Sequence, residues 1–563
     1  MLARSEQLKK IAGQTFDVVV IGGGATGSGC ALDAQLRGLS VVMLDAGDFA
    51  GATSSAATKI VHGGVRYLEE AIKDVDPKEY HVVVRALHER VRMMENAPHL
   101  TRKLDFLVPS YSWLNAAYLD IGLKIYDWLA GSARIAPSKF LGREETLKRM
   151  PNVKKEGLLG AVSYYDGQFD DSRYNTATVL SFVKAGGAAL NYARVTGLLR
   201  DAATGKLTGV TVKDQIGGGG TFDVHAEVIV NATGPFADAI RKQANASVPT
   251  RMRLSKGSHI LFPIEKFPTQ DAMLIPKTDD GRVLFAVPWG GRLLVGTTEQ
   301  EVTPDEEYYV TKEDVAFMLK QLNHYTETPL TPEDIVAGFA GARPLVSSGE
   351  NESTKSLARD DVIEIDKTSG LISIMGGKWT THRAMAEDTI TAVQKALDKP
   401  ITDCATKTFK LYGSEGFTET FWEELVREYG VSKETAHLLA RKFGTAAKDV
   451  LNLAKVNPSL AQPLIPGHPY PQAAVVYVVR EEMAMTIEDV LARRLGVQFY
   501  SWRDAIHAAP VVAALLGKEL GWTDEQTRAA TTAYVEKINR WLEHAGLARE
   551  TASGSSAATS SAN

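Results

Sequence analysis

Cysteine is almost absent from this chain. Only Cys30 and Cys404 occur among its 563 residues, and they lie far apart in the sequence. Two isolated thiols cannot form a disulfide framework, an iron–sulfur ligand set or a zinc cluster. We therefore expect a protein of a reducing compartment, without a metal site.

Long apolar runs and an excess of positive charge are missing as well. The longest apolar-looking stretch, Ala505 to Leu516, contains His507 and Pro510 and is too short to cross a bilayer. The N-terminus mixes charged side chains with no apolar core ahead of them, unlike a secretion signal. The 63 Lys and Arg are outnumbered by 68 Asp and Glu, which gives a net charge of −5. Secretion, membrane spanning and nucleic-acid binding are therefore not expected.

The chain does contain enough apolar side chain, 44% of its residues, for several cores. At about 100 to 200 residues per domain, its length predicts three or four structural units. Near the N-terminus, the pattern predicts a strand at Phe16 to Ile21, a helix at Ala25 to Leu36 and a second strand at Val41 to Leu44. Such a βαβ unit predicts a parallel sheet.

A glycine motif joins the first strand to the helix. Gly22 permits a tight turn, Gly24 lets the backbone approach a diphosphate, and Gly27 allows close packing of helix and strand. Asp45 ends the second strand, where a carboxylate can accept hydrogen bonds from a ribose diol. The motif, with Ala25 and Thr26 inside it, predicts a site for FAD or NAD and not for NADP.

Three further segments favour FAD over NAD. Small and hydroxyl residues follow Asp45 at 51–55, a buried strand ends at 231–235, and glycines precede a helix at 375–381. Three separated contacts suit a long flavin dinucleotide, and a helix N-terminus can stabilise a reduced flavin. The predicted cofactor contacts in these segments are Thr53, Ser54, Ser55, Ala232, Thr233, Gly234, Gly377, Lys378 and Thr380.

The later chain divides by pattern. Turn signals at 201–205 and 217–220 predict a β-meander from Ala188 to Val230, and hairpin signals at 280–281 and 290–291 predict a largely antiparallel sheet at 251–340. Beyond residue 400 the pattern is amphipathic helix, with capping boxes at Thr486 and Thr523.

Motifs along the chain carry a family resemblance. The segments VVVIGGGATGSG, ATSSAATKIVHGGVRYLE, VNATGPF, KGSHI, GARPL, LARDDVIEI and GGKWTTHRAMAEDTI occur in this order. The chain resembles the FAD-dependent, membrane-associated glycerol-3-phosphate dehydrogenases, within the glycine-oxidase-like flavoproteins, and resembles their bacterial form because no calcium-binding loop is visible. The resemblance implies FAD as cofactor, sn-glycerol 3-phosphate as substrate, dihydroxyacetone phosphate as product and a quinone as electron acceptor.

The resemblance also implies an architecture. We expect an α/β fold with a Rossmann-like FAD-binding domain, an antiparallel-sheet substrate domain and an all-helical C-terminal domain. The expected limits are 1–110, 155–250 and 340–400 for the FAD-binding domain, 111–154 for a helical excursion, 251–339 for the substrate domain, 401–549 for the helical domain and 550–563 for a disordered tail.

A phosphorylated polyol needs cations for its dianion. Matching the family motifs puts Arg66, Tyr67, Arg343, Arg359 and Lys378 around the substrate, and His62, Gly63 and Gly64 around the cofactor. His259 is the first choice for the base that takes the C2 hydroxyl proton, since an imidazole has a pKa near neutrality. Lys378 or Arg343 could instead polarise that oxygen.

The same motifs are compatible with other functions. An amino-acid oxidase of the same fold, or a glycerol-phosphate oxidase that uses oxygen, would keep the cofactor site. A non-catalytic FAD-stabilised scaffold would not need the cations, and residues 431–443 resemble part of a helix-turn-helix but carry few basic residues.

Only one dinucleotide motif and no second redox motif are evident in the sequence. The reduced flavin must therefore pass its electrons directly to a diffusing acceptor. With a membrane quinone as acceptor, the protein would lie peripherally on the inner, cytoplasmic face of the cell membrane. Tyr111 to Leu129, rich in aromatic and aliphatic residues and containing Lys124, is the candidate contact. The alternative is a helix packed in the protein core, because Asp120 and Asp127 would disfavour an anionic membrane. The sequence does not fix the oligomeric state, and a homodimer is one assembly that it allows.

Overall fold

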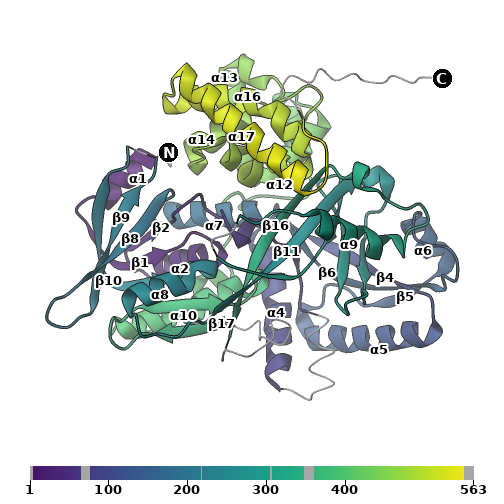
Figure 1. The fold of residues 1–563 in the computed structure, drawn as a ribbon, viewed down its shortest axis with the longest axis horizontal. Coiled ribbons are helices and arrows are strands. Elements are labelled where there is room, and N and C mark those ends of the chain that lie inside the picture. The colour runs from purple at the N-terminus through teal and green to yellow at the C-terminus, as the bar shows by residue number, and fades with distance from the viewer. Residues whose placement is uncertain (1–3, 65–76, 217, 305–306, 348–360, 551–563) are drawn as a thin grey trace.

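The computed structural model describes residues 4–64, 77–216, 218–304, 307–347 and 361–550. Figure 1 shows three parts: a first sheet with its helices, a second sheet beside it, and a helical C-terminal region that lies over both. The predicted α/β class, with a helical C-terminal domain, is confirmed.

The first sheet contains the predicted βαβ unit. Its strand order is β17-β18-β10-β1-β2-β7, and β7, β2, β1, β10 and β18 run parallel. The meander attaches through β9, which pairs antiparallel with β10. The strands are β1 Thr15–Ile21, β2 Val41–Leu44, β7 Ala188–Leu190, β8 Ala193–Arg200, β9 Leu207–Asp214, β10 Thr221–Asn231, β17 Asp361–Ile365 and β18 Ile372–Gly376.

Both faces of this sheet are covered. One face packs against α2, α7 and α10, and the other packs against the meander strands together with α1 and α8. All four residues of β2 are buried, as a parallel strand covered on both faces requires. Helix α2 packs against α10 and α7. The helices of this part are α1 Arg4–Ile11, α2 Ala25–Leu36, α7 Asp171–Lys184, α8 Ala237–Ala244 and α10 His382–Ala396.

The second sheet is larger than the sequence predicted. Its order is β15-β11-β14-β13-β12-β4-β6-β3, with β16 paired to β11 and β5 to β6. Strands β4 and β6 belong to it, although residues 101–110 and 160–169 were expected in the FAD-binding domain. The strands are β3 Ile60–Val61, β4 Thr101–Ser110, β5 Lys139–Gly142, β6 Gly160–Phe169, β11 Met252–Pro263, β12 Ala272–Ile275, β13 Leu284–Trp289, β14 Arg292–Gly296, β15 Gln300–Val302 and β16 Ala337–Val346.

This difference has a physical reason. A strand pattern shows that a segment is extended and half buried, but not which distant strand completes its hydrogen bonds. Here β4 pairs with β6 and, in parallel, with β12 more than 150 residues away. For the same reason β16 extends the second sheet up to Val346, beyond the expected boundary at 340.

Four helices lie around the second sheet: α4 Pro77–Asn96, α5 Trp113–Ala130, α6 Arg143–Arg149 and α9 Lys312–Asn323. Helix α5 lies at the lower edge in Figure 1. Its inner face, with Leu123, Tyr126 and Leu129, is buried, whereas Trp113 is 65% and Leu114 84% exposed. One face of α5 therefore packs against the protein core, and the other face exposes apolar side chains to solvent.

The C-terminal region is helical, as predicted. Both capping boxes are present, with the Asp489 N–H donating to Thr486 Oγ1 and the Gln526 N–H to Thr523 Oγ1. Within the described ranges, no helix combines the length and apolar character needed to cross a membrane. The helices are α11 Phe421–Tyr429, α12 Lys433–Phe443, α13 Ala447–Val456, α14 Ala473–Glu482, a π-helical turn at Asp489–Arg494, α15 Val497–Tyr500, α16 Trp502–Leu520 and α17 Asp524–His544.

The disordered tail was expected to begin at Glu550, but the structure describes this residue in an ordered position. Glu550 is held by the Asn539 side chain, whose Oδ1 accepts from the Glu550 N–H at 2.8 Å. Residues 551–563 lie outside the described part of the chain.

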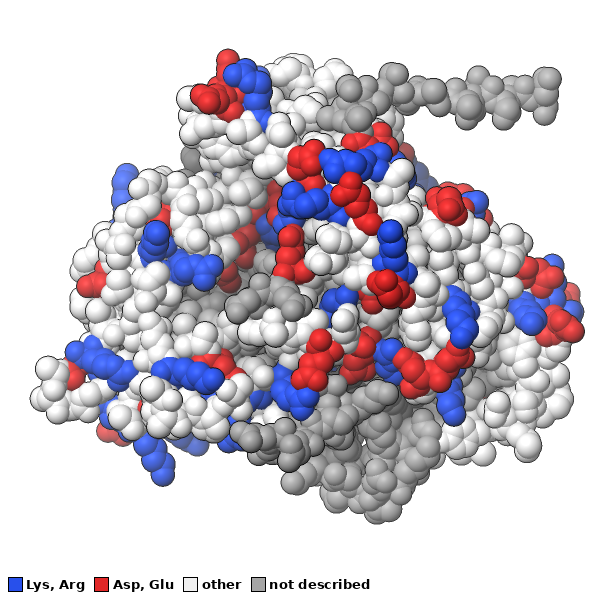
Figure 2. All heavy atoms as spheres, viewed as in Figure 1, with Lys and Arg blue, Asp and Glu red and all other residues white. Residues whose placement is uncertain are grey.

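Charged side chains of both signs are mixed on the surface, whereas at the domain junction they form buried ion pairs. Figure 2 shows basic and acidic side chains interspersed on the face drawn, so neither sign dominates there.

Buried ion pairs join the helical region to the first sheet. Arg173 of α7 pairs with Glu482 of α14, with Arg173 Nη2 and Glu482 Oε1 2.8 Å apart. Both residues are at most 3% exposed. Desolvated charges need such partners, so this contact fixes the junction.

We predict that Glu482→Gln destabilises the protein by about 3 kcal/mol, because it leaves a buried guanidinium without its carboxylate. Equilibrium urea unfolding followed by circular dichroism measures this. The control is Glu519→Gln, which removes the partially exposed pair with Arg480 and should cost less than about 1 kcal/mol. Equal losses in both variants would contradict the structural role of the Arg173–Glu482 pair.

Candidate active site

The glycine turn between β1 and α2 is shaped by close backbone contacts. Gly22 has φ +107°, and a Cβ there would lie 2.6 Å from the carbonyl oxygen of Ala232. A Cβ on Gly27 would lie 1.9 Å from the Gly22 carbonyl oxygen. Both positions exclude any larger residue, since no side chain can shift to relieve a backbone clash. The turn therefore brings the start of α2 close to the end of β10.

Gly24 differs from these two glycines. It is the N-cap of α2, and a Cβ there would meet only the Ser54 hydroxyl, at 2.9 Å. Ser54 Oγ accepts a hydrogen bond from the Ala25 N–H at 3.0 Å. The first turn of a helix presents N–H groups and a partial positive charge, which attract an anion. The surface at Gly24 thus fits a diphosphate that approaches the backbone closely.

Asp45 is fixed at the end of β2. Its Oδ2 accepts from the Gly23 N–H at 2.6 Å, and its Oδ1 accepts from the Gly47 N–H at 2.8 Å. Burial raises the pKa of Asp45 to about 6, although these two N–H groups act in the opposite direction. At neutral pH the carboxylate form predominates, and it retains lone pairs for a ribose diol.

These elements line a cavity of about 990 Å³. This volume lies at the upper end of the usual range for cofactor sites, about 300 to 1,000 Å³. The cavity, its glycine wall and the oriented carboxylate together fit FAD. Predicted residues in its lining are Gly22, Gly24, Ala25, Thr26, Asp45, Thr53, Ser54, Ala232, Thr233, Gly234, Gly377 and Lys378.

The turn after β18 approaches the same cavity. Gly376 and Gly377 have φ of +74° and +80°, which only glycine adopts readily. The Trp379 indole N–H donates to the Ser54 carbonyl oxygen at 2.9 Å. The His62 N–H donates to Thr380 Oγ1 at 3.3 Å. The structure thus brings Lys378 and Thr380 next to the 51–55 segment and His62.

His259 and Arg343 lie together on the second sheet. In the antiparallel pairing of β11 and β16, His259 lies opposite Phe339, and Ser255 lies opposite Arg343. Because His259 and Ser255 are four residues apart on one strand, all four side chains lie on the same face of the sheet. A Cβ on Gly257 would lie 2.5 Å from Arg343 Nη2, so this glycine leaves room for the guanidinium. Arg343 Nη2 donates to Thr297 Oγ1 at 2.8 Å.

His259 is almost fully buried, with 2% of its surface exposed. Its ring stacks on Phe339, with centroids 4.7 Å apart, and its Nε2 lies 3.0 Å from Thr58 Oγ1. Its Nδ1 has no hydrogen-bond partner in the described part of the chain. Burial, together with Arg343 and Lys59, holds the pKa of His259 well below its usual value. The imidazole is therefore neutral at physiological pH, and the near-neutral pKa expected from the sequence does not hold for it.

The segment 53–58 connects these groups. Thr53 Oγ1 donates to the Ala342 carbonyl oxygen at 2.6 Å, beside Arg343 on β16. Ser54 contacts Trp379, beside Lys378, and Thr58 contacts His259. The turn of Lys378, the strand of Arg343 and the His259 ring therefore all contact one short segment at the cavity wall.

Other predicted residues are placed differently. Arg66, Tyr67 and Arg359 lie outside the described residues, and Gly64 is the last described residue before that gap. The Gly63 N–H donates to the Tyr126 hydroxyl at 2.8 Å. Among the described residues, the lining of the large cavity includes neither His259 nor Arg343, and Ser55, His62 and Thr380 lie beside it. Gly27 packs behind the glycine turn.

Sequence reasoning missed several residues around this site. Lys59 is buried between the Asp171 carboxylate, 2.6 Å from its Nζ, and three aromatic rings, and it anchors the 53–58 segment. Its adjacency to the ATSSAAT motif was the only available signal. Glu488, Arg493 and Lys537 of the helical region also line the large cavity. No signal in the sequence connects them to a motif more than 400 residues away.

The fold and the cavity define a dinucleotide-binding oxidoreductase. The sequence profile of the family described as FAD dependent oxidoreductase matches residues 17–387, and that described as the C-terminal domain of alpha-glycerophosphate oxidase matches residues 404–527. The predicted cofactor, FAD, is thereby supported as the one this family uses.

Relatives narrow the family. The mitochondrial glycerol-3-phosphate dehydrogenase of Mesocricetus auratus is 39% identical over 524 residues, 91% of this chain and 72% of that one. A probable glycerol-3-phosphate dehydrogenase of Encephalitozoon cuniculi is 35% identical over 96% of this chain and 87% of its own. The crystal structure of the Bacillus halodurans glycerol-3-phosphate dehydrogenase, complexed with FAD, matches with a TM-score of 0.76 and 29% identity, covering 96% of this chain and 98% of that chain. This chain therefore belongs to the FAD-dependent glycerol-3-phosphate dehydrogenases.

We predict that Gly24→Val abolishes FAD binding while the chain still folds, because the new side chain meets only a hydroxyl of the protein but occupies the position of the diphosphate. Flavin content after purification and the circular dichroism spectrum measure both effects. Gly142→Val is the matched control, since a Cβ there has no heavy atom within 4 Å. A folded Gly24→Val protein with normal flavin content would remove the diphosphate from this turn.

Proposed function

We propose that the protein oxidises sn-glycerol 3-phosphate at C2 to dihydroxyacetone phosphate. The observation that carries this proposal is that the 53–58 segment, at the wall of the cofactor cavity, contacts the turn of Lys378, the strand of Arg343 and the His259 ring. FAD, when bound, supplies the two-electron acceptor for the hydride that leaves C2.

The cations suit a phosphate dianion. Arg343 presents a planar guanidinium that can bind two phosphate oxygens, and Thr297 orients it. Lys378, at the glycine turn, lines the cavity and adds a point charge. Arg66, Tyr67 and Arg359 complete the proposed substrate site from the sequence motifs. An amino-acid substrate, with a single carboxylate, would not need this number of cations.

We propose His259 as the base. A neutral imidazole can accept the C2 hydroxyl proton, and Thr58 holds its Nε2 edge, which leaves Nδ1 for that proton. As the proton moves to His259, the C2–H bond breaks with its electron pair, and the C2–O bond becomes a carbonyl. Arg343 would stabilise the negative charge that develops on this oxygen.

The electron acceptor is proposed to be a membrane quinone, reached from the inner face of the cell membrane. Support comes from the outer face of α5, where Trp113, Leu114, Tyr118, Ile121 and Trp128 are each at least 57% exposed. Aromatic and aliphatic side chains in this arrangement are typical of helices that lie in a membrane interface. Lys124 is exposed but pairs with Asp120 at 2.5 Å, so it contributes little net charge.

Molecular oxygen is the second candidate acceptor. The match of residues 404–527 to the C-terminal domain of alpha-glycerophosphate oxidase favours it. Stoichiometric peroxide formation at a rate equal to that of substrate turnover would distinguish an oxidase from a quinone-reducing dehydrogenase. The homodimer remains a prediction from the sequence.

Arg343→Ala tests the proposed substrate site. Loss of a charge-assisted contact of about 1.5 to 3 kcal/mol should lower kcat/KM for sn-glycerol 3-phosphate by about 10- to 150-fold. The flavin spectrum should remain unchanged. Arg253→Ala, which removes an arginine paired with Glu301 on the same sheet, is the control and should leave kcat/KM near wild type. Unchanged kinetics for Arg343→Ala would move the substrate elsewhere.

His259→Asn tests the proposed base. We expect flavin reduction by substrate to slow by about 10² to 10⁴-fold in stopped-flow experiments, with near-normal substrate affinity, because a general base acts in the transition state. His99→Asn is the control, since His99 is equally buried but contacts Ser414. Reduction of His259→Asn at the wild-type rate would exclude His259 from the mechanism.

The membrane contact is tested on α5. Replacing Trp113, Leu114, Ile121 and Trp128 by Ser or Gln should lower binding to phosphatidylethanolamine and phosphatidylglycerol vesicles by at least about tenfold, since apolar burial supplies the binding energy. The variant keeps Leu123, because this side chain is on the buried face of α5. Turnover with a soluble dye should persist. The control replaces Ile401 and Val456, which are 57% and 86% exposed elsewhere. Vesicle binding retained by the α5 variant would show that another surface meets the membrane.

A further inference from the structure

The helical C-terminal region forms part of the wall of the cofactor cavity. Glu488 and Arg493 from its π-helical turn, and Lys537 from α17, line the large cavity together with the glycine turn. The same three residues line an adjoining cavity of about 250 Å³, which shares Gly51, Ala52 and Thr53 with the larger one. This region therefore meets the cofactor site at the loop that follows Asp45.

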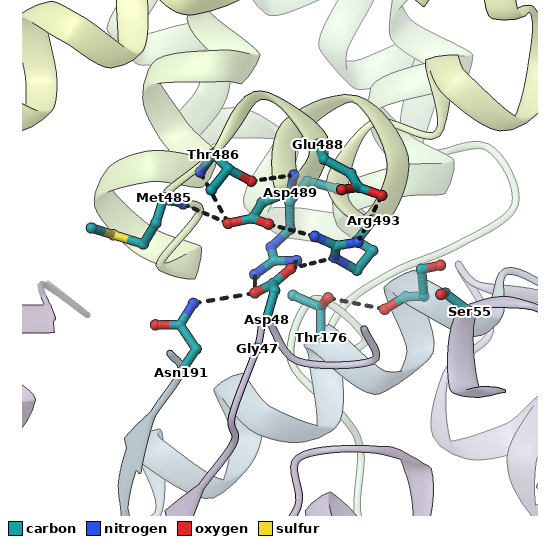
Figure 3. A network of polar contacts seen from close by, with 12 residues as sticks. Gly47, Asp48, Ser55, Thr176, Asn191, Met485, Thr486, Glu488, Asp489 and Arg493 are labelled. Carbon is teal, nitrogen blue, oxygen red and sulfur yellow. Dashed lines mark hydrogen bonds and ion pairs between the residues drawn. The ribbon is translucent and has the colours of Figure 1, made fainter. Parts of the chain in front are cut away.

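Arg493 is held in a fixed orientation. Its Nε pairs with Asp48 Oδ2 at 2.7 Å, and its Nη2 pairs with Asp489 Oδ1 at 2.5 Å. Figure 3 shows Arg493 between Asp489 on its own helical turn and Asp48 on the loop below. Asp489 is itself oriented by the N–H groups of Met485 and Thr486.

One edge of this guanidinium has no hydrogen bond to any described residue. Arg493 Nη1 makes only a long ion pair, 3.8 Å, to Glu488 within the described part of the chain. Asp48 does not depend on Arg493 alone, because Arg494 binds both oxygens of Asp48 at 2.8 Å. The Arg493 Nη1 group, with two N–H donors, is thus available to a ligand in the cavity.

The position of Arg493 matches the part of the cofactor that carries charge. Burial raises the pKa of Asp45, the proposed ribose contact, and the positive charge of Arg493 is among the groups that oppose this rise. The same cavity is lined by the start of α2, where the diphosphate is expected, and by the 51–53 loop. The described part of the cavity is lined by four cationic side chains, of which two come from the helical region, and by four carboxylates. The cations are Arg194, Lys378, Arg493 and Lys537, and the carboxylates are Asp45, Asp48, Glu307 and Glu488.

Lys537 is the second cation that the helical region contributes to the cavity lining. Its Nζ lies 3.0 Å from Glu488 Oε2 and 3.3 Å from Glu307 Oε1. These two carboxylates hold the ammonium group at the cavity rim. They also partly offset its charge, so Arg493 is the stronger of the two cations for an added anion.

We propose that Arg493, assisted by Lys537, binds the diphosphate of FAD, so that the helical C-terminal region closes the cofactor cavity and its docking is coupled to cofactor binding. The coupling is reciprocal: FAD that contacts both parts stabilises their junction, and a well-docked helical region binds FAD more tightly. The proposal concerns the cofactor alone and holds for any substrate that the enzyme oxidises.

The test uses the full-length chain stripped of flavin, with FAD, ADP and adenosine as probes. In Arg493→Gln, the affinities for FAD and ADP should fall by about tenfold or more, because a charge-assisted contact to the diphosphate is lost. Adenosine, which lacks the diphosphate, should bind within about twofold of wild type. Lys537→Gln, at a partly exposed position that tolerates replacement, should weaken FAD and ADP by a smaller factor of about threefold.

The matched control is Arg480→Gln, which removes an arginine of the same helical region that pairs with Glu519 away from the cavity. It should leave all three affinities unchanged. The proposal is overturned if ADP and adenosine weaken equally in Arg493→Gln, since the effect would then be structural. It is also overturned if Lys537→Gln and a folded Arg493→Gln bind FAD and ADP as wild type does.

Discussion

The loop that follows β2 depends on buried charges that other parts of the chain must neutralise. Asp48 is 2% exposed, and an unpaired carboxylate at that depth would cost several kcal/mol. Arg493 and Arg494 of the helical region supply the counter-charges, and the Asn191 amide donates to Asp48 as well. The loop that carries the cofactor contacts is thus fixed by residues more than 400 positions later in the chain.

A buried charge near the proposed reaction centre is neutralised in the same way. Lys59 is buried against Asp171, and its pKa is lowered mainly by burial, although Asp171 acts in the opposite direction. Between Asp48 and Lys59, Thr53 is fixed by β16 and Ser54 by Trp379. A segment held from the first sheet, the second sheet and the helical region can position cofactor and substrate rigidly, as hydride transfer requires.

Local chemistry made part of this predictable from sequence. The turn from Gly22 to Gly27 and the carboxylate of Asp45 follow from neighbouring residues, and the structure has the strand, helix and turn at the expected positions. Placement of β4 in the second sheet was not predictable, because its partner β12 is distant in sequence. The position of Arg493 in the cavity wall was equally hidden, since a basic residue on an amphipathic helix usually faces solvent. Similarly, the composition of α5 could not show that Leu123 faces the core while Leu114 faces solvent.

The central claim is that a glycerol phosphate reduces the flavin held in this cavity. The most direct measurement mixes the purified holoprotein with sn-glycerol 3-phosphate without oxygen and follows the visible flavin absorbance, with glycerol and glycine as comparison compounds. The account predicts that sn-glycerol 3-phosphate bleaches the flavin and yields one dihydroxyacetone phosphate per flavin, while glycerol and glycine do not. Flavin that stays oxidised with saturating sn-glycerol 3-phosphate, or that glycine bleaches instead, would contradict it.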